Sequence, residues 1–189
     1  MGHSGEVEGI VVSKPAVIVL VSRIGAGKST LGQALSTLSG YQVFSFGQYV
    51  KQIALTRGIG MSRKALQDLG EQLVASDPEL FTTTALAGVD FDAGVIIDGL
   101  RHQSVLEQIR LLANHVPVIM VFVSTDRKVR IDRLVARGMN LAEIDAADNH
   151  IMERLLEETF LPVADTVVDG TVLPNLNAQI ILNRAKGLQ

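Results

Sequence analysis

A glycine-rich turn between an apolar run and a helical run limits most strongly the folds open to this chain. The turn occupies residues 22–30 and reads Ser-Arg-Ile-Gly-Ala-Gly-Lys-Ser-Thr. Residues 16–21 are apolar and rich in β-branched side chains, which predicts a short buried strand, and residues 31–35 have helical spacing. A phosphate-binding loop needs this order, because glycines let backbone N–H groups turn toward an anion and the helix N-terminus adds its dipole.

The same motif predicts individual roles. Lys28 is expected to span the β- and γ-phosphates of a nucleotide, and the hydroxyl of Ser29 to bind Mg²⁺. The pattern has glycine five residues before Gly27, whereas this chain has Ser22, a small residue that fits unless its φ is positive. The alternative is a turn that binds nothing, and the agreement of strand, loop, lysine and serine argues against it. The predicted nucleotide-binding residues are Ile24, Gly25, Ala26, Gly27, Lys28, Ser29 and Thr30.

Composition excludes several classes of function. The chain has 189 residues, which predicts one domain, and it has no cysteine, which excludes thiolate nucleophiles and thiolate metal sites. A net charge of −3 gives no electrostatic case for a nucleic-acid partner, and no apolar run approaches the ~20 residues that span a membrane. Residues 1–8 lack the features of a signal peptide. We therefore expect a cytoplasmic protein, monomeric or homodimeric, with no nucleic-acid or membrane partner.

Four further apolar segments are predicted strands, and helical segments alternate with them. Their continuous apolar character indicates a parallel sheet covered on both faces. The alternation predicts one three-layer α/β/α domain over residues 15–189, after a flexible lead-in over residues 1–14. The predicted strands are residues 41–45, 94–98, 116–123 and 166–168, and the predicted helices are residues 28–38, 47–57, 62–75, 78–87, 104–113, 126–137, 141–158 and 174–186.

Residues 46–93 are too many for a single crossover between two strands. They are expected to form two or three helices inserted at the carboxyl edge of the sheet, beside the glycine-rich loop, where α/β proteins bind ligands. A second substrate is predicted to bind there. The alternative is that these helices pack as ordinary core.

Two charged residues follow the predicted strand at 94–98. Asp98 ends the strand, at the place of the aspartate that holds Mg²⁺ through water in enzymes with this loop. Arg101 follows closely, and its guanidinium is suited to bidentate phosphate binding. The alternatives are a solvated turn aspartate and a surface arginine.

Arginines recur on the predicted helix at 126–137. Arg130, Arg133 and Arg137 share one face, where three cations repel one another unless an anion lies over them. Because a loop follows directly, Arg133 and Arg137 are expected to act on a triphosphate, whereas Arg127 and Arg130 are expected on a solvated face. The expected buried side chains of this helix are Ile131, Leu134 and Val135, and the expected partners of its solvated arginines are Asp126 and Asp132.

Taken in order, these segments resemble the nucleoside monophosphate kinase-like branch of the P-loop kinases, which includes adenylate, dephospho-CoA and shikimate kinases. The matching segments are residues 25–30, 44–47, 98–101, 133–137 and 168–171. The resemblance implies a P-loop NTPase fold with a five-stranded parallel sheet of order 2-3-1-4-5. It further implies a substrate-binding helical region at residues 46–93, a short lid at residues 137–146, and residues 168–171 near the adenine of ATP.

The resemblance also implies roles for single residues. Arg101 would grip the phosphate of the acceptor, while Arg133 and Arg137 would hold ATP and the transferring phosphoryl group. The implied sets are Lys28, Asp98, Arg133 and Arg137 for catalysis, Gly170 and Thr171 for ATP, Ser29 and Asp98 for Mg²⁺, and Ser45, Gly47, Lys51, Gln67 and Arg101 for the acceptor.

Two departures and one weak motif accompany the resemblance. Adenylate kinases have aspartate and arginine where this chain has Gln48 and Lys51, and Lys51 keeps the charge without the guanidinium fork. His150 and Glu153 resemble a motif of small uncharacterised kinase-like ATPases, and their alternative is to cap a polar helix face.

The class of acceptor follows from what the second predicted strand lacks. Shikimate and dephospho-CoA kinases place an aspartate there to deprotonate a hydroxyl, and residues 41–48 hold no carboxylate. A phosphate acceptor is already ionised at neutral pH, so we expect transfer from Mg-ATP to a nucleoside or deoxynucleoside monophosphate. Residues 63–70 resemble deoxynucleoside monophosphate kinases, which favours the same acceptor. The alternatives are a small-metabolite kinase that uses Asp98 or Asp68 as base, and a nucleotide-binding switch that hydrolyses ATP slowly.

Overall fold

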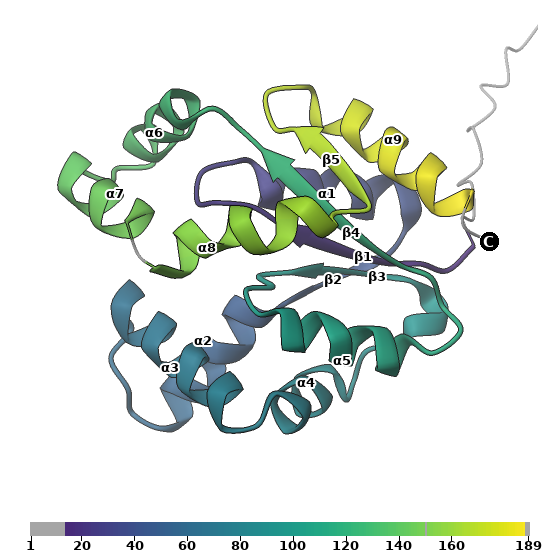
Figure 1. Cartoon of the computed structure of the whole chain (residues 1–189), viewed down its shortest axis with the longest axis horizontal. Helices are drawn as coiled ribbons and strands as arrows, with labels where there is room; N and C mark the ends of the chain where they lie inside the picture. The colour runs from purple at the N-terminus through teal and green to yellow at the C-terminus, as the bar shows by residue number, and fades with distance from the viewer. Residues whose placement is uncertain (1–13, 150, 188–189) are drawn as a thin grey trace, which may run out of the picture.

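Five parallel strands form the centre of the molecule, in the order β2-β3-β1-β4-β5 (Figure 1). This computed structural model describes residues 14–149 and 151–187. The predicted sheet order is confirmed, and each predicted strand is present with ends shifted by up to two residues. The strands are β1 (Val17–Val21), β2 (Gln42–Ser45), β3 (Val95–Asp98), β4 (Val118–Ser124) and β5 (Thr166–Asp169).

The central strand β1 is buried on both faces, which explains its continuous apolar sequence. Val17, Val19 and Val21 belong to one core cluster, and the alternate residues Ile18 and Leu20 belong to the other. The two clusters are the two faces of the sheet, because successive side chains of a strand point to opposite sides.

Helices cover both faces of the sheet. The helices α1 and α9 contribute to the core on one face, and α2 to α5 with α8 contribute to the other. In Figure 1, α6 and α7 lie beyond the end of β4, on the side of the loop between β1 and α1. The helices are α1 (Lys28–Ser39), α2 (Phe46–Thr56), α3 (Arg63–Ser76), α4 (Pro78–Leu86), α5 (Gln103–Ala113), α6 (Arg127–Ala136), α7 (Leu141–Asp148), α8 (Ile151–Phe160) and α9 (Pro174–Lys186), with short 3-10 turns η1 (Phe91–Ala93) and η2 (Leu161–Val163).

One predicted helix is wrong. The segment 141–158 forms two helices, α7 and α8, rather than one. Helix α7 starts with a capping box, in which Asn140 and Glu143 each bond the other's backbone N–H. It ends at Asp148, whose side chain is buried in an ion-pair cluster described below. His150, between the two helices, lies outside the described residues.

The inserted segment 46–93 contains α2, α3, α4 and η1. Its apolar side chains join the same core as the sheet, because Phe46, Val50, Leu69 and Phe81 cluster with residues of β1, β3 and β4. The insertion is therefore continuous with the core while its polar side lies beside the carboxyl ends of the strands. Within the described residues, no helix is both long and apolar enough to cross a membrane.

Candidate functional site

The loop between β1 and α1 has the backbone geometry of an anion cradle. Gly25 and Gly27 adopt φ of 80° and 100°, which L side chains rarely reach. Ser22 fits its position, because Asn114 is the one described non-glycine residue with positive φ. The N–H groups of Gly25, Gly27 and Lys28 make no hydrogen bond to another described residue, and no side chain caps α1. They are therefore free to bind a phosphate at the helix N-terminus.

Lys28 and Asp98 meet at the carboxyl edge of the sheet. The Nζ of Lys28 bonds Oδ1 of Asp98, which ends β3, next to β1 in the sheet. Ser29 lies exposed beside Lys28 in the first turn of α1. The described residues contain no cluster of three or more His, Cys, Asp or Glu side chains that would hold a metal ion alone. One hydroxyl and one carboxylate fit Mg²⁺ in kinases, where phosphate and water oxygens complete the coordination.

Arg133 joins the phosphate-binding loop to the turn after β5. Its Nη1 donates to the carbonyl of Ala26 over 3.1 Å, and its Nη2 donates to the carbonyl of Gly170 over 2.8 Å. A Cβ on Gly170 would lie 2.2 Å from the carbonyl oxygen of Ala26, so only glycine permits this approach. Arg137 behaves differently: it caps the C-terminus of α6 and is exposed, with no ion pair to another described residue.

The turn that contains Gly170 is held by Asp169. Oδ1 of Asp169 accepts hydrogen bonds from both the N–H and the hydroxyl of Thr171, over 2.8 and 2.7 Å. These two bonds lower the pKa of Asp169. Of the two residues predicted to lie near the adenine, Gly170 is thus placed beside Ala26, and Thr171 follows it in the turn held by Asp169.

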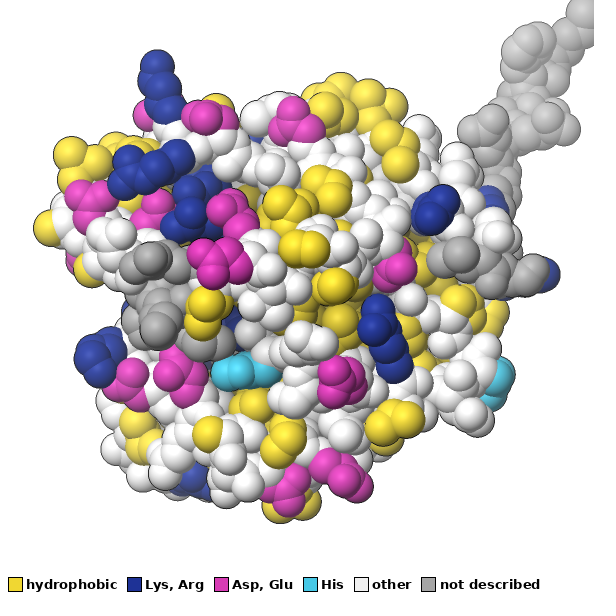
Figure 2. All heavy atoms as spheres, viewed as in Figure 1, with side chains coloured by type: hydrophobic (Ala, Val, Ile, Leu, Met, Phe, Trp, Pro, Cys, Tyr) yellow, Lys and Arg dark blue, Asp and Glu magenta, His cyan; other side chains and the backbone are white. Residues whose placement is uncertain are grey.

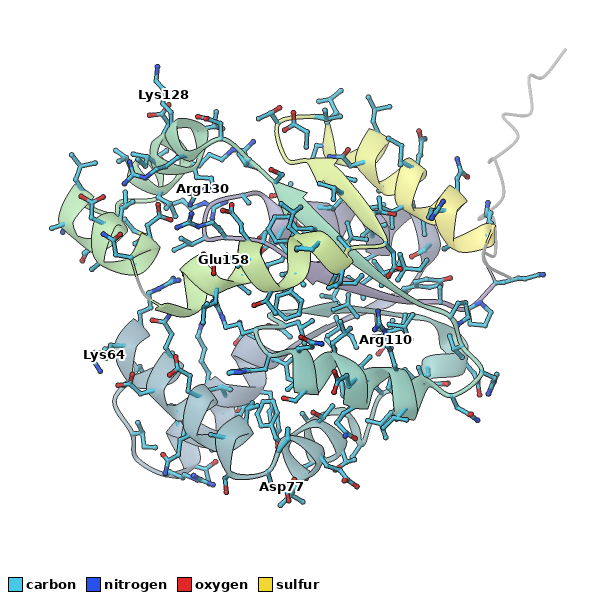
Figure 3. All side chains as sticks on the ribbon, viewed as in Figure 1. Lys64, Asp77, Arg110, Lys128, Arg130 and Glu158 are labelled. Atoms are coloured by element: carbon cyan, nitrogen blue, oxygen red, sulfur yellow. The ribbon has the colours of Figure 1, made fainter. Side chains whose placement is uncertain are left out.

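A buried ion-pair cluster corrects the prediction for Arg130, whereas Arg127 is exposed as predicted but has other partners. Arg130 is buried rather than solvated, and its guanidinium donates to both oxygens of Asp148, at 2.7 and 3.3 Å. Arg127 and Arg23 also reach Asp148, over 3.2 Å each, and Arg127 further pairs with Asp145. Among the described residues, the predicted partners Asp126 and Asp132 form no ion pair with Arg127 or Arg130. Figure 3 shows Arg130 beneath α6 while Lys128 projects outward.

The cluster also ties α7 to the phosphate-binding loop. Arg130 donates to the carbonyl of Ile24 over 3.2 Å, and Arg23 donates to the backbone carbonyl of Asp148 over 2.9 Å. Burial raises the pKa of Asp148, but the arginines outweigh it, so this pKa lies below its usual range. Val135, predicted to be buried, is 48% exposed because α6 turns Arg130 and Leu134 inward instead. On the surface, acidic and basic side chains interleave over α6 and α7 (Figure 2).

A cavity of about 530 Å³ lies between the insertion and the end of β3. Four predicted acceptor residues line it, namely Gly47, Lys51, Gln67 and Arg101. The fifth, Ser45, caps α2 by accepting a hydrogen bond from the N–H of Gln48 and is absent from the lining. The cavity combines basic and polar groups with an apolar floor. Its lining also includes Phe46, Arg63, Leu66, Glu71, Phe81, His102 and Met139.

The aromatic rings of the floor are packed against one another. Phe46 and Phe81 stack with centroids 5.5 Å apart, and Tyr49 packs edge-on against Phe81. Burial lowers the pKa of His102. The negative charge of Glu71 opposes this shift, and the positive charge of Arg101 adds to it. His102 is therefore neutral at pH 7 and acts as a polar, uncharged wall.

Glu153 is a residue of this site that the sequence analysis did not assign. Its side chain is fully buried. Its Oε2 accepts from the N–H of Ile24 over 2.9 Å, and its Oε1 bonds Arg101 at 2.8 Å and Arg63 at 3.3 Å. A single carboxylate thus touches both the phosphate-binding loop and two arginines of the cavity. In the sequence, only the three-residue spacing between His150 and Glu153 drew attention to Glu153, and this spacing does not indicate which residues Glu153 contacts.

Comparison with known proteins agrees with this geometry. A family model described as "AAA domain" matches residues 18–156, which is more than half of the chain. The chain belongs to the AAA domain family. This AAA domain is 27% identical over 123 residues to a UPF0200 protein of Methanothrix thermoacetophila, and 29% identical over 131 residues to UPF0200 protein PH1008 of Pyrococcus horikoshii. Each match covers 65% of this chain, and 66% and 68% of the two relatives.

Solved structures of kinases share the fold. The AAA domain resembles shikimate kinase from Acinetobacter baumannii, with a TM-score of 0.61 and 16% identity over 94% of this chain and 96% of that one. It also resembles a gluconokinase from Sinorhizobium meliloti, with a TM-score of 0.56 and 18% identity over 93% and 94% of the two chains. A deoxyadenosine kinase from M. mycoides is similar too, with a TM-score of 0.53 and 17% identity over 90% of this chain and 99% of that one. The predicted P-loop NTPase fold is therefore confirmed.

Proposed function

We propose that this AAA domain is an ATP-dependent phosphotransferase that moves the γ-phosphate of Mg-ATP to a nucleoside or deoxynucleoside monophosphate. The main support is that Glu153 contacts both the N–H of Ile24, at 2.9 Å, and the guanidinium of Arg101, at 2.8 Å. The phosphate-binding loop and the cavity are therefore separated by one carboxylate. Two sites this close suit direct transfer between two bound molecules.

The lining of the cavity supports a phosphate acceptor with an apolar, planar part. Arg101, Arg63 and Lys51 supply positive charge at the wall, and guanidinium groups bind phosphate with two parallel hydrogen bonds. The stacked rings of Phe46 and Phe81 lie in the floor, where the base of a nucleotide would find apolar contact.

The chain's own residues divide the work between the two sites. Mg²⁺, when bound with ATP, supplies charge neutralisation at the phosphates. Lys28 would stabilise negative charge on the transferring group, Ser29 would bind the metal ion, and Asp98 would hold it through water. Met139, in the turn before α7, lines the cavity, so this turn would help to exclude water during transfer.

A hydroxyl acceptor is the competing possibility, and the carboxylate of Glu71 in the cavity favours it. Hydroxyl kinases need such a base, and two of the structural relatives are named as shikimate kinase and gluconokinase. Asp68, the base considered from the sequence, lies on the exposed side of α3 and pairs with Lys64. The two proposed acceptors differ in one requirement: phosphoryl transfer to a hydroxyl would need Glu71 as base, and transfer to a phosphate would not.

The test is an acceptor panel assayed with Mg-ATP. The panel contains ribo- and deoxynucleoside monophosphates, shikimate, gluconate and a sample without acceptor, with ADP and phosphorylated product quantified by chromatography. We expect one ADP and one nucleoside diphosphate per turnover, with wild-type protein and with Glu71→Gln. Lys28→Ala serves as the inactive control, and Lys128→Ala as a matched control on the exposed side of α6.

Two results would contradict the proposal. Phosphorylation of a sugar or acid hydroxyl that is lost in Glu71→Gln would assign a small-metabolite kinase. Loss of ATP at the same rate with and without every acceptor would assign an ATPase or nucleotide-dependent switch.

A further inference from the structure

Glu153 connects three segments that are far apart in the chain. It lies in α8, whereas its partners are Ile24 in the phosphate-binding loop, Arg63 at the start of α3, and Arg101 after β3. The side chain is fully buried, and both oxygens are used. Ile24 bonds one oxygen, and the two arginines share the other.

A buried carboxylate of this kind is costly to fold and needs all its partners. Removing a charge from water is unfavourable unless opposite charges and hydrogen bonds compensate it. Here the compensation comes from the two arginines of the cavity together with one N–H of the loop. Burial lowers the pKa of Arg63, and the negative charge of Glu153 opposes that effect.

Arg101 is left with a donor group to spare. Its Nη2 forms an ion pair with Glu153, whereas its buried Nη1 makes no hydrogen bond to another described residue. A buried donor without a partner costs free energy, which an incoming anion would recover. Glu153 thus holds one side of the guanidinium, and the buried Nη1 on the other side lacks a hydrogen-bond partner among the described residues.

We infer that Glu153 couples the phosphate-binding loop to the acceptor cavity, as a positioning residue that sets the orientation of Arg101 and Arg63 according to the state of the loop. The inference rests on the proposed function for the identity of the acceptor. The two oxygens belong to one planar carboxylate. If Ile24 moves, the oxygen that it bonds moves with it, and the carboxylate rotates so that its other oxygen changes position relative to the arginines. Such coupling is reciprocal: ATP improves acceptor binding by the factor by which the acceptor improves ATP binding.

The experiment measures this factor in Glu153→Gln and in Glu158→Gln, an exposed matched control on the same helix (Figure 3). Calorimetry gives the Kd of AMP and of dCMP with and without the non-hydrolysable analogue AMP-PNP and Mg²⁺. We expect AMP-PNP to tighten binding of the acceptor about tenfold in wild type and in Glu158→Gln, and by less than about twofold in Glu153→Gln. The Kd of AMP-PNP alone should stay within about threefold in all three proteins.

A second readout needs no acceptor. Hydrogen exchange of residues 61–75 and 99–104 is followed with AMP-PNP and Mg²⁺ alone. We expect these segments to gain protection in wild type and not in Glu153→Gln. If Glu153→Gln fails to fold, Glu153→Asp replaces it, because it keeps the charge and shortens the side chain so that it no longer reaches all partners.

The two readouts separate this inference from the proposed function. If wild type binds no nucleoside monophosphate while AMP-PNP still protects the cavity through Glu153, the acceptor is wrong and the coupling stands. If the Glu153 variant that folds retains the wild-type factor or the wild-type protection, the coupling is overturned whatever the acceptor. An acceptor Kd that falls in Glu153→Gln would also overturn it, since Glu153 would then compete with the acceptor for the arginines.

Discussion

The ion pair between Lys28 and Asp98 places opposite charges at the start of α1 and at the end of β3, with both side chains 20% exposed. Neither group is needed to fill the core, and both face the end of the sheet where the phosphate-binding loop lies. Substitutions here are therefore expected to change chemistry more than stability.

Lys28→Ala should lower the rate of phosphoryl transfer several hundredfold and leave the fold intact. One preorganised charge of this kind contributes about 3–4 kcal/mol to the stabilisation of a transition state. Steady-state assays with the acceptor found in the panel measure the rate, and circular dichroism checks folding. Turnover within about tenfold of wild type would refute the role of Lys28, while Lys128→Ala should match wild type.

Arg101→Lys should raise the KM of the acceptor about tenfold or more, with little change in the KM of ATP. Lysine keeps the positive charge but loses the planar fork that pairs with Glu153 and that, under the proposed function, would also bind a phosphate. The matched control is Arg110→Lys, on the exposed face of α5 (Figure 3). A change confined to the KM of ATP would remove Arg101 from the acceptor site.

Residues differ in how far their surroundings could be predicted. The phosphate-binding loop is readable because its strand, glycines, lysine and helix are adjacent in sequence. Glu153 is not, since its partners Arg63 and Ile24 lie 90 and 129 residues away. The prediction that Arg130 is solvated is wrong for the same reason. Helical spacing gives the direction of a side chain relative to its own helix, but not which neighbouring element covers that side chain.

At the scale of single elements, the start of α7 was encoded locally and its end was not. The Asn140 and Glu143 capping box marks the first turn. The helix stops where Asp148 meets Arg130, 18 residues away, and Arg23, 125 residues away. The periodicity of residues 141–158 carries no trace of those tertiary contacts, so it predicts one long helix.

Asp148→Asn should destabilise the protein by about 3–5 kcal/mol at pH 7, because it leaves the buried Arg130 without its counter-charge. Urea denaturation measures the loss. Asp145→Asn, which removes an exposed partner of Arg127, should cost less than about 1 kcal/mol. Equal losses of unfolding free energy for the two substitutions would show that the buried cluster does not stabilise the protein.

The same cluster predicts how stability depends on pH. The pKa of Asp148 is lower in the folded than in the unfolded protein, so its contribution is fully present above about pH 4, the ordinary value of the unfolded carboxyl. The contribution is lost as the pH falls through the lower, folded value. Between pH 7 and pH 3, the stability difference between wild type and Asp148→Asn should therefore shrink, as measured by urea titration at each pH.

At the scale of the whole molecule, the sheet could be predicted further than the insertion. Continuous apolar strands and alternating helices determine a parallel three-layer domain, and the resemblance added the strand order. How residues 46–93 sit on that sheet depends on packing of Phe46, Val50 and Phe81 against residues from other strands, which the sequence alone does not specify.

The whole molecule is predicted to close around its ligands. Residues 137–146 and the exposed parts of 47–75 should exchange amide hydrogens fastest without ligand, and should be protected by a bisubstrate compound that joins adenosine to a second nucleoside through phosphates. Gly138 and Gly58, at φ of 87° and 65°, sit in the turns where backbone rotation is easiest. Hydrogen exchange with mass spectrometry tests this, and equal protection with and without the compound would indicate a static site.

The two carbonyl contacts of Arg133 have a thermodynamic consequence. Because one guanidinium spans Ala26 and Gly170, bonds within the protein itself set the spacing between the phosphate-binding loop and the turn at Gly170. A cradle ordered in this way gives up little conformational entropy when a nucleotide enters. The ordering cost has been met during folding, so the affinity for nucleotide depends on contact enthalpy and on the water released from the loop.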